Sequence, residues 1–301
     1  MNYEILELDH KNIVIGKEIR RYKKISSTQD LALFLISNPE EQSNSHYNGL
    51  VILSDEQTAG KGRAERKWVS NIGGLWFSIM LIKPNIPASD TNLIQMLSAT
   101  SVCETINALT NLKAKIKWPN DILINSKKVA GILLDVGIKG SKIDYLVIGI
   151  GINVNTDSNT TRNELQNKQY DDKNIKKNNN DLNLDVTSLK DELNIRELGK
   201  LKILKDILEK IELYLFSIEQ DQKPINNENA HKLIEKYKSL CETIGKRICI
   251  YDKGQIRYCA FAKEINDDGS LVIQRDEDGH IVVDKVFFGD VSVREMSQNE
   301  R

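Results

Sequence analysis

The chain has 301 residues, 42 of them lysine or arginine and 43 aspartate or glutamate, and hydrophobic residues make up 40% of the composition. This length allows one large domain or two of unequal size, and the near-balance of charge argues against a general nucleic-acid binder held by bulk electrostatics. No apolar run approaches the roughly 20 residues that span a bilayer, and the N-terminus lacks the apolar segment of a secretory signal, so a cytoplasmic protein without membrane contact is predicted.

Cysteine and histidine are scarce in this chain. Cys103, Cys241, Cys249 and Cys259 show no CxxC spacing, and there are only four histidines. Reduced thiols are therefore expected, and a metal site fixed by the protein alone has little support.

Helix and strand patterns alternate through the first half of the chain. Ser26 or Ser27 can cap a helix that runs through the apolar residues at 31–35. Apolar residues recur at helical spacing over 90–112, which predicts a long helix. Short apolar runs predict strands at 49–57, 73–81, 114–125, 127–138 and 142–155. This order indicates an α+β fold in which a mixed sheet carries helices mainly on one face.

Residues 156–183 interrupt the pattern. Eight of these 28 residues are asparagine and three are aliphatic. Too little apolar surface can be buried there to offset the loss of chain entropy, so a mobile, Asn-rich surface insertion is predicted. Its lysines could form a partner site, but a solvated loop is the better-supported interpretation.

The predicted secondary structure changes twice in the second half of the chain, first to helices and then to short strands. Helical patterns resume at 187–195, 199–220 and 229–241. After Gly245, five short strands separated by turn sequences such as NDDG and DEDG describe a small antiparallel barrel. The boundary between two domains is therefore expected near residues 241–246.

Residues 57–68, QTAGKGRAERKW, are called here the basic loop. They match neither the GxxxxGK[ST] nor the GxGxxG phosphate motif. Gly60 and Gly62 would let the backbone approach a ligand closely, and Arg63 and Arg66 carry planar guanidinium groups that suit carboxylate or phosphate. On spacing alone, a flexible surface loop is as well supported as an anion site.

Three further segments place glycine beside polar or cationic residues at strand ends. They are KWPND at 117–121, KKVAGILLD at 127–135 and GIGIN at 149–153. Each alone has an ordinary interpretation, such as a hairpin turn or the solvent end of a strand. If the segments share a sheet, Arg63, Arg66, Lys117 and Lys128 surround one cleft, which would suit a substrate with several anionic groups, such as a nucleotide plus a carboxylate.

At this point the residues resemble a known family. The segments SSTQD, QTAGKGRAERKW, GGLWFS, KWPNDILINSKKVAGILLD and GIGINVN occur in the order and approximate spacing of the biotin–protein ligases, also called biotin–[acetyl-CoA-carboxylase] ligases or holocarboxylase synthetases. The resemblance covers residues 25–155 and, more weakly, the C-terminal barrel. It implies a class II synthetase-like catalytic domain over 1–242, which binds biotin and ATP, and an SH3-like barrel over 243–301.

The resemblance also implies a two-step reaction. Biotin and MgATP give biotinyl-5′-AMP and pyrophosphate, and the biotinyl group then passes to a lysine of a biotin carboxyl carrier domain of a carboxylase. A carboxylate that attacks a phosphate needs cations that neutralise both anions. Mg²⁺ would accompany ATP near Asp121.

Residue roles are carried over from the family by position. The implied catalytic residues are Lys128, which bridges the biotin carboxyl and the α-phosphate, with Arg63 and Asp121. The implied biotin-binding residues are Ser27, Thr28, Gln29, Gln57, Lys61, Gly62, Arg63, Lys128, Gly131 and Gly149. The implied ATP-binding residues are Arg63, Arg66, Trp68, Lys117, Asn120, Asn153 and Arg294.

The basic loop departs from the family pattern, GRGRxGRxW, at two positions. Lys61 replaces an arginine and keeps its charge but not its bidentate geometry, and Glu65 replaces a glycine. Both changes are expected to alter the closure of the loop without abolishing activity, because Arg63, Arg66 and Trp68 are retained.

Three alternatives remain beside a biotin ligase. A DNA-binding repressor is disfavoured, because only about 24 residues precede the first motif and a winged helix needs about 60. A lipoate–protein ligase shares the fold and chemistry, and a catalytically silent biotin-binding module would retain the pocket. Members of the family can pair through sheet edges, so a homodimer stays open.

Overall fold

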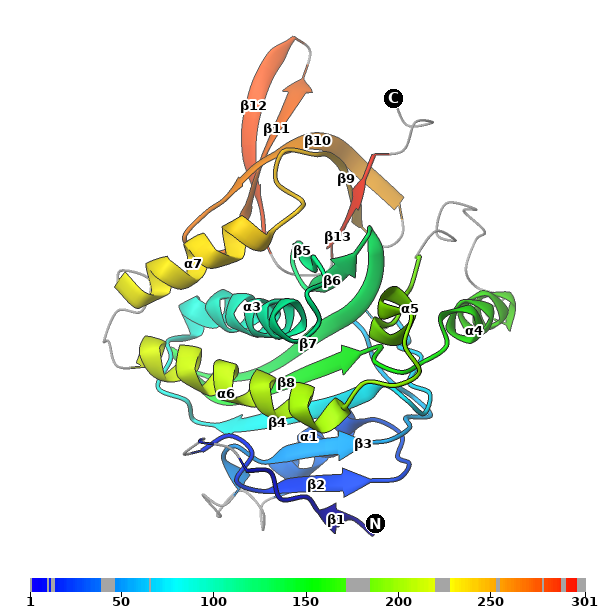
Figure 1. Ribbon diagram of the computed structural model, residues 1–301. Helices are drawn as coiled ribbons and strands as arrows, with labels where there is room; N and C mark the ends of the chain where they lie inside the picture. Colours follow the sequence, from blue (N-terminus) through cyan, green and yellow to red (C-terminus); the bar gives the residue numbers. More distant parts are fainter. Residues whose placement is uncertain are drawn as a thin grey trace.

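The computed structural model (Figure 1) describes residues 2–9, 11, 14–38, 47–64, 66–171, 185–219, 228–252, 255–277, 279–287 and 291–296, with only the backbone for 166–171, 291, 292 and 294. The first sheet contains β1 (Glu4–Ile5), β2 (Ile19–Tyr22), β3 (Val51–Ser54), β4 (Leu75–Ile82), β5 (Lys115–Lys117), β6 (Asp121–Ile124), β7 (Lys127–Lys139) and β8 (Lys142–Ile152). The helices are α1 (Thr28–Ser37), η2 (Ala88–Asp90), α3 (Thr91–Thr110), α4 (Ser158–Asp171), α5 (Leu189–Leu193), α6 (Lys200–Glu219) and α7 (Glu228–Leu240).

The first sheet has eight strands in the order β1-β2-β3-β4-β8-β7-β6-β5. The pair β2–β3 is parallel and the other neighbours are antiparallel, so the sheet is mixed. Of its two central strands, β4 is buried at seven of eight positions and β8 at six of eleven, because helices pack against both faces. None of the helices in the described part of the chain combines the length and the apolar composition needed to cross a membrane.

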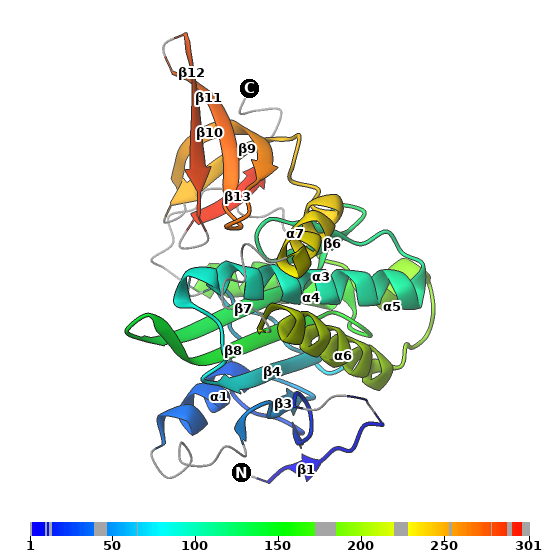
Figure 2. The ribbon, with the colours of Figure 1, turned by 90° about the vertical axis from the view of Figure 1, so that its left-hand side faces the viewer.

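The two faces of this sheet are covered unequally. The helices α3, α6 and α7 lie on one face and α1 lies on the other (Figures 1 and 2). The sequence of α6 explains its position, because its buried apolar residues recur at helical spacing, namely Ile203, Leu204, Ile207, Leu208 and Ile211. On the opposite face, Met80 and Val147 form a smaller core with α1. The predicted α+β class, with helices mainly on one face, is confirmed.

A second sheet follows α7. Its order is β12-β11-β10-β9-β13, and all its neighbouring strands are antiparallel. The strands are β9 (Arg247–Asp252), β10 (Gln255–Ile265), β11 (Leu271–Glu277), β12 (His280–Val286) and β13 (Val291–Glu295). Five strands were predicted in this region, and the residues that the structure describes there form five.

Several expectations need correction. The run at 114–125 is not one strand but the hairpin β5–β6, with KWPND at its turn, because the Trp118–Pro119 segment cannot continue a ladder. The short strands β1 and β2 were not predicted. Cys249 and Cys259 form a disulfide, contrary to the expected thiols, because β9 and β10 place them directly opposite, with Cα atoms 4.0 Å apart.

The Asn-rich segment is also not a loop throughout. Residues 158–171 form α4, and the remainder of the predicted insertion, 172–183, lies outside the described residues. Tertiary contacts stabilise α4: Glu164 Oε1 accepts a hydrogen bond from Asn71 Nδ2 at 2.7 Å, and Arg162 Nη2 donates one to the Val186 carbonyl at 2.9 Å. A composition-based prediction cannot detect such contacts.

Hydrogen bonds from segments that follow α6 in the chain stabilise the KWPND turn. Tyr237 Oη of α7 donates to the Pro119 carbonyl at 3.1 Å, and Trp118 Nε1 donates to the carbonyl of Gly269, in the β10–β11 turn, at 3.1 Å. Thr243 Oγ1 accepts from Trp118 N at 2.9 Å. Burial raises the pKa of Tyr237 well above its usual value, so its phenol stays protonated and remains a donor.

We expect Tyr237→Phe to lower the free energy of unfolding by about 1–2 kcal/mol, because the buried Pro119 carbonyl would lose its donor. Urea unfolding followed by circular dichroism measures this change. Tyr3→Phe, at a side chain that is 44% exposed, is the matched control and should cost far less. Equal unfolding midpoints for the two variants would show that the Tyr237 hydroxyl contributes nothing to the stability of the turn.

Candidate active site

A pocket opens on the sheet face that carries α1, and strand register explains its floor. Gly131 pairs with Gly151 and Leu133 pairs with Gly149 across β7 and β8, so all four positions point to the same face. Ser78 of β4 pairs with Gly149 and adds a hydroxyl to that face. Three glycines on adjoining positions leave a hollow where other sheets carry side chains.

Two other side chains lie close above these glycines. A Cβ atom added to Gly131 would stand 2.9 Å from the Trp68 ring, and one added to Gly151 would stand 2.8 Å from it. At Gly149 an added Cβ would stand 2.4 Å from Gln29 Oε1. The close neighbour of Gly131 is therefore the indole ring of Trp68.

A β-bulge aims Lys128 into the same pocket. The pairing of β6 with β7 skips Val129, which is an extra residue on β7. In a regular strand, residues three apart point to opposite faces, yet both Lys128 and Gly131 line the pocket. The bulge thus decides that the lysine faces the pocket.

Lys128 has two electrostatic partners inside the pocket. Its Nζ lies 2.6 Å from Asp121 Oδ1, at the start of β6, and 4.9 Å from the centroid of the Trp68 ring. The side chains of Lys128 and Asp121 are 17% and 19% exposed, so solvent screens this pair less than a surface pair. The ammonium group is therefore fixed between a carboxylate and an aromatic face.

The basic loop folds back on itself as an irregular hairpin. Gln57 bridges Ser70, Lys61 bridges Lys67, and Trp68 N donates to the Gly60 carbonyl at 2.8 Å. This pairing brings the two ends of the loop together at the pocket.

The tip of the basic loop contacts both α1 and the KWPND turn. Arg63 Nη1 donates to Asn120 Oδ1 at 3.0 Å, and Lys61 Nζ pairs with Asp30 Oδ1 of α1 at 2.5 Å. Lys61, the first departure from the family pattern, thus makes a single ion pair with α1. Glu65, the second departure, lies outside the described residues.

The polar residues at the N-terminus of α1 are bonded to the ends of the basic loop. Ser27 is the N-cap, and its Oγ accepts from Asp30 N at 3.2 Å. Gln57 Oε1 accepts from Thr28 N at 2.7 Å, while its Nε2 donates to Ser70 Oγ at 2.8 Å. The side chain of Gln57 therefore joins the helix start to the loop.

Gln29 is held by the protein on both sides of its amide. Its Nε2 donates to Asp135 Oδ2 at 2.8 Å and to the Val147 carbonyl at 3.1 Å, which occupies both protons. Its Oε1 accepts from Ser78 Oγ at 2.9 Å. Gln29 lines the pocket but has no spare donor for a ligand, so it acts here as a support for the floor.

The charges of the pocket are strongly unbalanced. Among its described lining residues, the cations are Lys61, Arg63, Arg66, Lys67 and Lys128, and the one carboxylate is that of Asp121. Such an excess attracts ligands with more than one negative charge.

Nearly all of the predicted site residues line this one pocket. They are Ser27, Thr28, Gln29, Gln57, Lys61, Gly62, Arg63, Arg66, Trp68, Asn120, Asp121, Lys128, Gly131, Gly149 and Asn153. Lys117 lies on β5 outside the lining, and Arg294 lies on β13 with its side chain outside the described part of the chain. The predicted ATP-binding role of Lys117 thus receives no support from the lining, and that of Arg294 stays a prediction.

Sequence reasoning missed other lining residues. Gly151 could have been found, because it lies two residues after Gly149 and so on the same face. Thr161 and Leu165 of α4 and Val186 also line the pocket, but they lie in or beside the Asn-rich segment, where no local pattern marks them.

Comparisons with known proteins agree on the family of this region. Residues 22–153 match the model of the biotin/lipoate A/B protein ligase family. The chain is 40% identical over 157 residues to the bifunctional ligase/repressor BirA of Bacillus spizizenii, an alignment that covers 52% of this chain and 46% of that protein. It is 26% identical over 254 residues to the biotin–[acetyl-CoA-carboxylase] ligase of Mycobacterium tuberculosis, covering 83% and 80%. The chain thus spans less than half the length of the Bacillus relative.

A solved structure resembles the whole described fold. The biotin protein ligase from Aquifex aeolicus in complex with biotin and ATP superposes with a TM-score of 0.69 at 23% identity, covering 93% of this chain and 100% of that one. The fold, the positions of the motifs and the family model agree with one another. Residues 22–153 of this chain, which supply most of the pocket, are thus similar in sequence to the biotin/lipoate A/B protein ligase family.

Proposed function

We propose that this protein is a biotin–protein ligase, which activates biotin with ATP and transfers it to a lysine of a biotin carboxyl carrier domain. The observation that carries the proposal is the position of Lys128, aimed by a bulge into a pocket that holds five cations, one carboxylate and a glycine floor. The names of the relatives support it, since several are biotin ligases.

The first step would join two anions. The carboxylate of biotin must approach the α-phosphate of ATP, and the repulsion between them falls only if cations lie beside both. Lys128 would leave Asp121 and pair with the biotin carboxylate and the phosphate. Arg63, already fixed by Asn120 at 3.0 Å, would meet the same charges from the basic loop.

The second step would need a neutral amine. The lysine of the carrier domain attacks the mixed anhydride of biotinyl-5′-AMP, forms the amide and releases AMP, with one proton leaving the amine. Asp121, once Lys128 has turned to the anions, is the carboxylate that would orient this amine.

Magnesium would enter with the nucleotide. The described residues contain no cluster of three His, Cys, Asp or Glu side chains that could hold a metal ion by itself. Asp121 is the carboxylate among the described lining residues, so it would be the protein oxygen donor nearest to a phosphate-bound Mg²⁺. The ion would neutralise phosphate charge there.

The domain organisation and the compartment are part of the same proposal. We place the domain boundary at 242/243, between α7 and β9, and propose that the second sheet closes as an SH3-like barrel in a cytoplasmic enzyme. A lipoate–protein ligase is the second candidate, because the matching family includes both activities.

The direct test is incubation with ATP and Mg²⁺, in one reaction with biotin and a biotin carboxyl carrier domain and in another with lipoate and a lipoyl domain. Mass spectrometry should show one biotinyl group on the carrier domain and no lipoyl group on a lipoyl domain. Lipoylation without biotinylation would replace the proposal with the second candidate. A protein that binds biotin but modifies neither domain would be a non-catalytic binding module.

We expect biotin and ATP together to protect the basic loop from trypsin. Cleavage after Lys61, Arg63 and Arg66 should slow by about tenfold or more, because the bound intermediate would fix the loop over the pocket. The fragments are measured by mass spectrometry over time. Cleavage after Lys202, on the opposite sheet face, is the internal control, and equal slowing at both places would indicate general stabilisation instead of loop closure.

A further inference from the structure

Residues 185–188, called here the strap, run alongside the start of β7. Asp185 O accepts a hydrogen bond from Lys128 N at 2.7 Å, and Thr187 N donates to Lys128 O at 2.9 Å. These two bonds make a parallel bridge between Lys128 and Val186. Both backbone groups of Lys128, next to the β6–β7 bulge, are therefore bonded to the strap.

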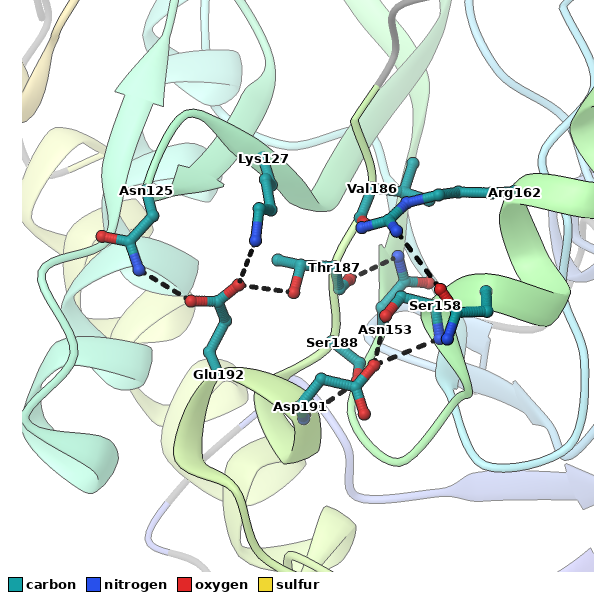
Figure 3. A network of polar contacts seen from close by, with 11 residues as sticks. Asn125, Lys127, Asn153, Ser158, Arg162, Val186, Thr187, Ser188, Asp191 and Glu192 are labelled. Carbon is teal, nitrogen blue, oxygen red and sulfur yellow. Dashed lines mark hydrogen bonds and ion pairs between the residues drawn. The ribbon is translucent and has the colours of Figure 1, made fainter.

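The same strap contacts the end of β8. Asn153 Nδ2 donates to the Thr187 carbonyl at 3.0 Å (Figure 3). Thr187 therefore bonds to Lys128 through its N–H and to Asn153 through its C=O. Lys128 and Asn153 are the residues proposed to meet the reacting groups and the nucleotide. Thr187 is thus the one residue of the strap bonded to both.

Glu192 of α5 holds Thr187 in this place. Thr187 Oγ1 donates to Glu192 Oε1 at 2.7 Å, and Asn125 Nδ2 donates to Glu192 Oε2 at 2.7 Å. Lys127 Nζ lies 3.5 Å from Oε1, and the Glu192 side chain is 9% exposed. Asn125 and Lys127 flank the β6–β7 turn, so Glu192 joins the strap to the turn that precedes Lys128 (Figure 3).

The charge of Glu192 is maintained despite its burial. Burial alone would raise the pKa of this carboxyl, but the hydrogen bonds from Thr187 and Asn125 and the charge of Lys127 outweigh that effect and lower the pKa below its usual value. Glu192 is therefore ionised at neutral pH and accepts strong hydrogen bonds.

We propose that Thr187, held through its hydroxyl by Glu192, is a positioning residue that sets the location of Lys128 relative to Asn153. This inference rests on the proposed ligase activity and extends it to residues that never touch a substrate. The reaction rate should depend strongly on the position of Lys128, because a displacement of about 1 Å at a reacting group can lower the rate by about 10²-fold. Without the Glu192 contact, the strap would keep its backbone bonds but lose the anchor that fixes them.

The test compares Thr187→Val with Thr187→Ser. Valine keeps the shape and the backbone bonds but removes the hydroxyl, whereas serine keeps the hydroxyl. We expect Thr187→Val to lower kcat for biotinyl-5′-AMP formation by about tenfold or more while KM for biotin changes less than about twofold, and Thr187→Ser to restore most of kcat. A quench-flow assay with labelled ATP measures both constants.

Ser158→Ala is the matched control. The Ser158 hydroxyl donates to Asp191 in the same polar network but bonds to neither Lys128 nor Thr187 (Figure 3). It should lower the melting temperature without lowering kcat. If Thr187→Val does not fold, Thr187→Ala, which leaves room for water beside Glu192, is expected to show the same fall in kcat.

Three outcomes would overturn the inference. An unchanged kcat in Thr187→Val or Thr187→Ala would show that the hydroxyl does not position Lys128. A fall of kcat in Ser158→Ala as large as that in Thr187→Val would indicate a general structural role. A wild-type protein that forms no biotinyl-5′-AMP would instead remove the proposed function, on which the inference rests, so the two failures are distinguishable.

Discussion

Lys128→Ala is expected to lower the rate of biotinyl-5′-AMP formation by about 10²–10³-fold, the magnitude typical for loss of one charged group that stabilises a transition state. The physical reason is local: the lysine is the cation fixed at the centre of the pocket, 2.6 Å from Asp121 and 4.9 Å from the Trp68 ring centroid. Removal would leave two substrate anions and the Asp121 carboxylate facing one another. Release of labelled pyrophosphate from ATP measures the rate.

The loss of activity in Lys128→Ala must be distinguished from a loss of activity caused by unfolding. Removal of Lys128 leaves a mostly buried carboxylate without its partner, so the double variant Lys128→Ala/Asp121→Asn should recover stability but not activity. Lys205→Ala, on α6 at the opposite face of the sheet, is the matched control and should keep full activity. Unchanged adenylate yield from folded Lys128→Ala would remove the lysine from its proposed role.

Gly151→Ala should have the second large effect. The added Cβ would stand 2.8 Å from the Trp68 ring, which must move for the methyl group to fit. Overpacking at a site of this kind costs about 1–3 kcal/mol, so we expect the Kd for biotin to rise by about 5–150-fold and the unfolding midpoint to fall. Isothermal titration with biotin and thermal denaturation measure the two effects separately.

Gly199→Ala provides the control for this prediction. A Cβ atom at Gly199 would meet no atom within 4 Å, so alanine should be tolerated there with wild-type biotin affinity. Biotin affinity in Gly151→Ala equal to that of Gly199→Ala would show that the Trp68 ring is free to shift and that the glycine is not needed for the pocket.

Much of the fold was predictable because long elements carry strong periodicity. The patterns at 90–112, 199–220 and 229–241 correspond to α3, α6 and α7, whose apolar residues recur at helical spacing and pack in one core. The strands β1 and β2 escaped prediction, since they are two and four residues long and no alternation can be recognised over so short a span. Helix α4 escaped it because its sequence is nearly devoid of apolar residues and its contacts are with distant segments.

Some residues of the candidate site could likewise be predicted from the sequence, and others could not. Motif order and the family resemblance identified most of the pocket's polar residues, including Lys128, Asp121 and the basic loop. Lys117 was assigned to the pocket from its place in KWPND, but the hairpin β5–β6 places it outside the lining. The strap residues went unnoticed, because Thr187 matters only through three hydrogen bonds to residues 128, 153 and 192.

The sequence by itself determined the class of the fold, the motifs and the chemistry that they suit, since periodicity, glycine positions and charged side chains are local properties. Only the tertiary structure decided which way those side chains point. The bulge at Val129 turns Lys128 toward Gly131, and the strand register of β7 and β8 places Gly131 and Gly151 beneath Trp68. QTAGKGRAERKW became part of a site because Arg63 reaches Asn120, 57 residues away in the chain, through a contact that no local pattern specifies.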